Sequence, residues 1–139
     1  MTTTLTPTMA IHLFAALGAL LLGPLAIWAR RSPHPMPALH RWTGRLWVLL
    51  MLGAALSAMG IRHSPLAMWQ GFSLIHLFVP LTLVSLAVAM WAVATRRIGL
   101  HRRIMQSLFV FALVVPGAFT LLPSRYLGDL VWGQWLGWM

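Results

Sequence analysis

The chain's composition is that of an integral membrane protein. Of its 139 residues, 60% are hydrophobic and only 8% are charged, and the formal net charge of +9 comes from ten arginines and one acid, Asp129. Cysteine is absent, which excludes disulfides, iron–sulfur clusters and thiolate metal sites. Glutamate is also absent, which excludes two-carboxylate catalysis and carboxylate proton relays. Any chemistry must therefore use histidine, arginine, tryptophan, methionine or a bound cofactor.

Four apolar segments of bilayer-spanning length follow one another along the chain. We predict membrane spans over about residues 9–29, 43–61, 72–95 and 104–122. The uncharged N-terminus has no basic region of the kind found in cleaved signal peptides. We therefore expect an all-α membrane protein, a four-transmembrane-helix bundle that forms a single domain over residues 1–139.

The C-terminal tail, residues 124–139, is rich in tryptophan. Trp132, Trp135 and Trp138 are spaced for one face of a helix. Tryptophan prefers the membrane–water interface, so we predict a short interfacial helix here.

Eight of the ten arginines lie in the loops that join spans one to two and three to four, or beside them. They are Arg30, Arg31, Arg41, Arg45, Arg96, Arg97, Arg102 and Arg103. The positive-inside rule places both loops in the cytoplasm and both termini outside, in a multi-pass protein of the bacterial inner (cytoplasmic) membrane. Because the arginines flank apolar runs, their charge indicates topology and not a nucleic-acid partner.

The first and third spans begin alike, and so do the second and fourth. Ile11-His12-Leu13-Phe14 is repeated as Ile75-His76-Leu77-Phe78, 64 residues on, and His40-Arg41 is repeated as His101-Arg102, 61 residues on. We predict two parallel two-helix repeats, residues 9–61 and 72–122, related by a pseudo-two-fold axis along the membrane normal.

This duplication places one pair of histidines in each leaflet. From the helix rise of about 1.5 Å per residue, His12 and His76 lie near the outer edge of the hydrocarbon, and His40 and His101 lie at the inner edge. Histidine is costly inside a bilayer, and two facing imidazoles suit axial ligation of haem iron. We therefore expect haem b at one or both pairs, with these four histidines as metal ligands.

Haem propionates need cations, and small residues would leave room for a flat ring. Arg41, Arg45, Arg102 and Arg103 accompany the inner pair, and Arg62 and Arg125 the outer pair. Ala16, Ala19 and Gly23 share the face of His12.

Other interpretations stay open. His40 and His101 fit interfacial residues beside topology-setting arginines, and His12 and His76 fit hydrogen bonds to neighbouring helices. The small faces also fit plain helix packing. A Cu(I) site that combines histidine with Met9, Met59 or Met68 has no diagnostic spacing. His34 and His63 fit solvated positions in connecting segments.

Taken together, these residues resemble an uncharacterised bacterial family of four-helix membrane proteins, domain of unknown function 2306. The resemblance covers nearly the whole chain and rests on His12, His76, His40-Arg41-x-x-Gly44-Arg45 and His101-Arg102-x-x-Met105. The layout also looks like that of the di-haem b-type cytochromes, which implies a four-helix bundle with one bis-histidine haem per leaflet.

The sequence therefore favours a b-type cytochrome that carries electrons within or across the membrane. Its partners would be membrane lipid and a quinone or a redox protein. The alternative is a non-catalytic accessory subunit of a larger respiratory or photosynthetic membrane complex, in which the histidines bond across helices or to a neighbour's cofactor. A homodimer is a further possible assembly. A copper or small-molecule transporter is the third hypothesis, although no broken helix or intramembrane acid marks a pathway.

Overall fold

The computed structural model describes residues 6–61, 74–122 and 126–137, which are helical nearly throughout. Within these residues three helices are long and apolar enough to cross a membrane, and a fourth apolar helix is shorter. The expected all-α fold is confirmed.

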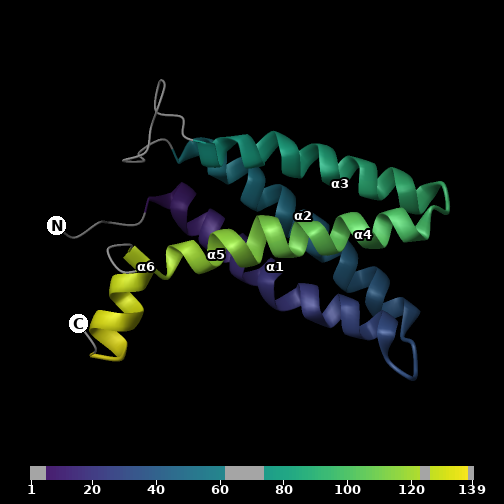
Figure 1. Cartoon of the computed structure of the whole chain (residues 1–139), viewed down its shortest axis with the longest axis horizontal. Coiled ribbons are helices and arrows are strands. Elements are labelled where there is room, and N and C mark those ends of the chain that lie inside the picture. Colours follow the sequence, from purple (N-terminus) through teal and green to yellow (C-terminus); the bar gives the residue numbers. More distant parts are fainter. Residues whose placement is uncertain (1–5, 62–73, 123–125, 138–139) are drawn as a thin grey trace.

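Two long helices form the first hairpin. Helix α1 runs over Pro7–Arg31 and helix α2 over Pro37–Gly60, and the two pack side by side in opposite directions (Figure 1). Both begin with proline, which suits the first helical turn because the N–H it lacks would have no partner there. The Thr6 hydroxyl caps α1 by accepting a hydrogen bond from the Met9 N–H at 3.3 Å.

The second hairpin pairs α3 with a long segmented helix. A 3₁₀ turn, η1 (Leu74–Leu77), leads into α3 (Phe78–Ala94). The partner helix is continuous over Ile98–Thr120 and consists of α4 (Ile98–Leu108), a π-helical segment η2 (Phe109–Val114) and α5 (Val115–Thr120). Proline at position 116 has no N–H for the regular ladder, so a change of helical pitch just before it is expected.

The predicted spans two and four start too late. Helix α2 begins at Pro37 and not at 43, and α4 begins at Ile98 and not at 104. Hydropathy misses these turns because they carry histidine and arginine, yet arginine is a good helix former at a membrane interface. The correction places His40 and His101 inside the first turn of their helices and not in front of them.

The predicted start of the third span, at residue 72, lies outside the described residues. Within them, helix α3 begins at Phe78, after the 3₁₀ turn that contains His76. The lead-in predicted around Trp69 lies outside the described residues.

The predicted C-terminal helix is confirmed. It consists of α6 (Tyr126–Gly128) and a π-helical segment η3 (Asp129–Trp135). The Trp132 indole N–H donates to the Leu121 carbonyl at 2.7 Å, which fastens the tail to the end of α5. Trp138 lies outside the described residues.

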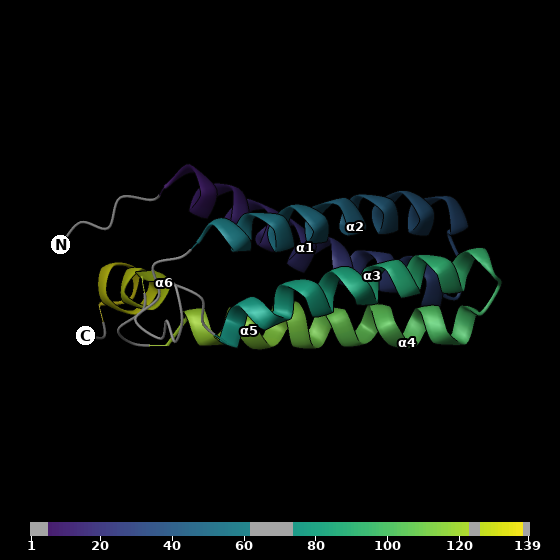
Figure 2. The same ribbon diagram turned by 90° about the horizontal axis from the view of Figure 1, so that it is seen from above.

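The two hairpins form two crossed layers (Figure 2). Between them lies a small core of Ala19, Trp47, Met51, Leu86, Leu108 and Leu113. Large apolar side chains instead point outward, among them Phe14 (80% exposed) and Leu21 (76% exposed). Small residues between helices and large apolar residues outside are typical of proteins packed in lipid. The α1–α2 and α3–α4 connections lie at one end of the molecule, and α6 lies at the other (Figures 1 and 2).

Candidate functional site

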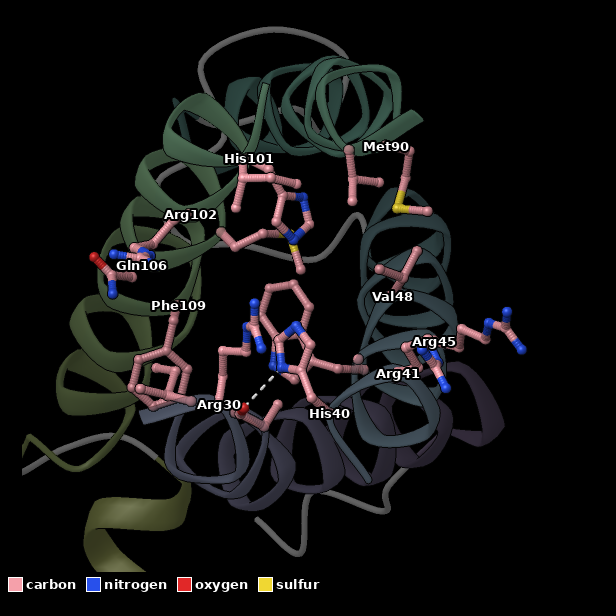
Figure 3. Close-up of a pocket in the computed structure, with 18 of the residues that line it drawn as sticks. Arg30, His40, Arg41, Arg45, Val48, Met90, His101, Arg102, Gln106 and Phe109 are labelled. Atoms are coloured by element: carbon pink, nitrogen blue, oxygen red, sulfur yellow. Dashed lines mark hydrogen bonds between the residues drawn. The ribbon is translucent and has the colours of Figure 1, made fainter. Parts of the chain in front are cut away.

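A pocket of about 550 Å³ opens between the four helices, at the end where both hairpins turn (Figure 3). Each of α1, α2, α3 and α4 contributes to its wall. The apolar part of the wall includes Ile27, Trp47, Val48, Met90, Val93 and Phe109. The volume falls within the range of about 300–1,000 Å³ that is usual for cofactor sites.

His40 and His101 both line this pocket, and they are held in the same way. The Nδ1 atom of His40 lies 2.9 Å from the Ala26 carbonyl oxygen on α1, and Nδ1 of His101 lies 3.0 Å from the Ala89 carbonyl oxygen on α3. Figure 3 shows the two rings extending into the space between the helices from opposite walls. Thus each hairpin orients one imidazole through a carbonyl of its first helix.

These hydrogen bonds select a tautomer. A carbonyl oxygen only accepts, so Nδ1 must donate its proton in both rings. Nε2 is then the nitrogen with a lone pair for a metal. A ring N–H bonded to a backbone carbonyl, with the opposite nitrogen available, is the usual arrangement of a metal-ligating histidine.

Small residues allow the helices to approach closely enough for these contacts. Ala29 on α1 and Ala89 and Ala92 on α3 are fully buried. Because each hairpin turn is short, the first turn of α2 or α4 must lie beside the last turns of the helix before it. The histidine in that first turn therefore faces a carbonyl about one and a half turns before the end of the preceding helix.

Five arginines line the same pocket, and no acid does. They are Arg30, Arg31, Arg41, Arg45 and Arg102. The chain's single acid, Asp129, lies in the C-terminal tail at the far end of the molecule (Figure 1). The Arg45 guanidinium also lies 5.5 Å from the centroid of the Trp42 ring. The pocket therefore suits a ligand with an apolar body and a negatively charged edge.

An aromatic cluster closes the deep end of the pocket. The Trp47 indole N–H donates to the Ala19 carbonyl at 2.9 Å, and a Cβ placed on Gly23 would lie 2.5 Å from the Phe109 ring. The small face that we expected to leave room for a haem under His12 is thus filled by aromatic rings from α2 and η2. At this depth Ala19 and Gly23 pack against these aromatic rings.

The outer histidines lie in a different environment. Nδ1 of His12 is 2.8 Å from the Ala54 carbonyl oxygen on α2 and 3.3 Å from the Ser57 hydroxyl. His76 instead uses Nε2, which is 3.0 Å from the Ile61 carbonyl oxygen. Ala54 and Ile61 are seven residues apart, or about 10 Å along a helix axis. The two rings are therefore tied to α2 and its C-cap at different heights, and neither lines the pocket.

The structure groups some of the predicted residues and adds others. Arg41, Arg45 and Arg102 join His40 and His101 in the pocket, and Arg103 does not. Arg62, Arg125, His63 and Met68 lie outside the described residues. His34 is exposed in the α1–α2 connection. Among the described residues no three potential ligands of the His, Cys, Asp and Glu types form a metal cluster.

Sequence reasoning missed Arg30 and Gln106 as pocket residues. Gly23, Ala26 and Arg30 are three and then four residues apart, which places them on one face of α1. Helical spacing from the carbonyl partner of His40 would therefore have found Arg30. Gln106 is an amide within an apolar helix, which is itself a signal of a polar site.

Comparison with known proteins assigns the family. The family model described as predicted membrane protein (DUF2306) matches residues 9–123. The chain belongs to this family. No curated protein and no solved structure matches it. The expected membrane location and transmembrane helices are thereby supported, and the likeness to di-haem cytochromes is not.

Proposed function

We propose that this membrane protein is a b-type cytochrome that holds one haem b between His40 and His101 and carries electrons. The observation that supports this proposal is the matched pair of imidazoles. Each donates its Nδ1 proton to a carbonyl of the preceding helix, and both line one pocket from opposite walls. Two neutral imidazoles presented in this way suit the axial positions of a six-coordinate iron.

The rest of the pocket also fits haem. Its apolar wall would contact the porphyrin faces, and Arg30, whose side chain extends into the cavity in Figure 3, would pair with a propionate. Arg30 is placed well for this because it lies one turn beyond Ala26, the residue whose carbonyl orients His40. When bound, haem supplies a one-electron iron couple, whose potential the protein tunes through ligands, charge and burial.

The orientation in the membrane follows from the same residues. We propose four spans, with α3 as the shortest. Its 17 residues measure about 26 Å, and the 3₁₀ turn before it adds length. The arginine-rich end would face the cytoplasm, which places both termini outside the inner membrane. A haem there would exchange electrons with a quinol or a soluble redox protein at the cytoplasmic face.

The two hairpins support the proposed duplication. The bond from His40 to Ala26 in the first hairpin has its counterpart in the bond from His101 to Ala89 in the second. The two carbonyl residues are 63 positions apart and the two histidines are 61 positions apart, close to the offsets of the sequence repeat, as expected when two parallel repeats share one ancestor.

Visible spectroscopy tests the proposal. The protein would be purified in detergent from haem-replete cells, and its oxidised and dithionite-reduced spectra recorded with a pyridine haemochrome assay. We expect sharp α and Soret bands and close to one haem per chain. His101→Ala should abolish these bands, and the matched control His34→Ala, at an exposed loop position, should retain them. A colourless wild-type protein, or full haem retention by His101→Ala, would refute the assignment.

A further inference from the structure

The turn between α3 and α4 holds an arginine in a backbone conformation that favours glycine. Arg96 has φ +60°, and within the described residues it is the one non-glycine residue with positive φ. Its N–H donates to the Val93 carbonyl at 3.2 Å, and the Arg97 N–H donates to the Ala92 carbonyl at 2.7 Å. This pair of bonds is a Schellman motif, whose left-handed position is usually glycine. Position 96 therefore carries an arginine although its backbone conformation favours glycine.

Arg97 is ordered by a tryptophan. Its guanidinium carbon lies 4.7 Å from the centroid of the Trp91 ring, within the range of a cation–π contact. The Trp91 side chain is 48% exposed on the outer surface of α3. Exposed tryptophans of membrane helices lie at the headgroup level, so this contact holds a cation at that depth.

Within the part of the chain that the structure describes, these two arginines form no ion pair and do not line the pocket. Asp129, the one acid of the chain, lies at the opposite end of the molecule, and neither Arg96 nor Arg97 lines the pocket. The positive charge that sets the membrane orientation would be sufficient with glycine at position 96, because Arg97, Arg102 and Arg103 would remain beside the turn.

We propose that Arg96 and Arg97, supported by Trp91, bind the phosphodiester headgroup of an anionic phospholipid. Guanidinium groups match phosphate oxygens in a bidentate geometry, and basic sites on the cytoplasmic side of membrane helices recognise anionic headgroups. The lipid's acyl chains would lie along the exposed apolar surface of α3, next to Trp91. This site goes beyond the proposed electron transfer and does not depend on haem.

Native mass spectrometry of the full-length protein in detergent tests the site, with phosphatidylglycerol as the probe and phosphatidylcholine as the neutral comparison. We expect saturable binding of phosphatidylglycerol, weakened about fivefold by Arg97→Gln. Arg96→Gly should weaken it by a similar factor while it maintains or raises the thermal midpoint, because glycine relieves the backbone strain. Loss of binding in that variant therefore does not result from unfolding.

Arg103→Gln is the matched control, since it removes the same charge from an exposed arginine near the turn that has no tryptophan contact among the described interactions. We expect it to change binding by less than about twofold. Equal weakening by Arg97→Gln and Arg103→Gln would mean diffuse charge attraction and would overturn the proposal. Equal binding of phosphatidylcholine would overturn it in favour of another ligand, such as an acidic protein surface. Displacement by inorganic phosphate at the concentration of the lipid would overturn the assignment to lipid.

Discussion

Both histidine pairs are duplicated in the sequence, but the surroundings of the two pairs differ in the structure. The outer pair has the longer repeated motif, with Ile-His-Leu-Phe around both His12 and His76. The inner pair shares the shorter motif Leu-His-Arg, yet His40 and His101 use the same ring nitrogen, make equivalent contacts and line one pocket. A repeated motif therefore indicates an equivalent position along the chain, not an equivalent environment.

The difference arises from what adjoins each histidine. At the inner end, each histidine follows a short turn and faces the helix that precedes it within the same hairpin. At the outer end, His12 bonds to Ala54, within the last two turns of its partner helix, whereas His76 lies in a 3₁₀ turn and bonds to the residue that ends the other hairpin. Local connectivity is thus repeated at the inner end and not at the outer end.

The largest expected effect separates the two pairs directly. The double variant His40→Ala/His101→Ala should lose all bound haem, because both iron ligands are removed. The double variant His12→Ala/His76→Ala should keep the haem and its spectrum. The measurement is haem per chain by pyridine haemochrome. If the outer double variant lost haem and the inner one kept it, the assignment of the two pairs would be reversed.

Glycine substitutions compare the packing at the two ends. Gly23→Ala should lower stability by about 1–3 kcal/mol, because its new Cβ would overlap the Phe109 ring at the base of the pocket. Gly53→Ala is the control at the outer end, where the new Cβ would lie 3.8 Å from the Cβ of Ala15. It should be nearly neutral. Thermal denaturation in detergent measures the stability of both variants. Equal midpoints would show that the aromatic cluster makes room for the new Cβ without loss of stability.

The arginines of the pocket should affect cofactor affinity more weakly than the histidines. Arg30→Gln is expected to weaken haem binding about threefold to fivefold, since an exposed ion pair contributes up to about 1 kcal/mol. Arg103→Gln, outside the pocket, should leave the affinity unchanged. Haem titration into the haem-depleted protein measures both values. An equal effect in the two variants would attribute the change to net charge.

The smallest effect concerns the outer pair as packing residues. Ser57→Ala should lower stability by about 0.6 kcal/mol, the average for a polar contact between membrane helices, because its hydroxyl lies 3.3 Å from His12 Nδ1. The haem spectrum should not change. Thermal denaturation followed at the Soret band reports both quantities, and a shifted spectrum would mean that the outer histidines influence the haem site.

Much of the fold could be predicted from the sequence, since apolar runs of bilayer length specify helices almost independently of their neighbours. The helix ends were predicted less well. His40 and His101 fell outside the predicted spans because hydropathy responds to transfer into lipid, whereas a helix continues through polar interfacial turns as long as its backbone hydrogen bonds are made. The sequence also did not indicate that Arg30 lines the pocket, because the role of Arg30 depends on the position of Ala26 beside α2.

By itself the sequence determined the membrane class, the helical content, the family and the residue types that any chemistry must use, because these depend on composition and on spacing within single segments. Only the tertiary structure decided which histidines share a pocket and which nitrogen each presents. Those properties depend on which carbonyl of another helix lies within about 3 Å of each ring. Helix packing determines which carbonyl group lies beside each ring, and the spacing of residues along the chain does not specify it.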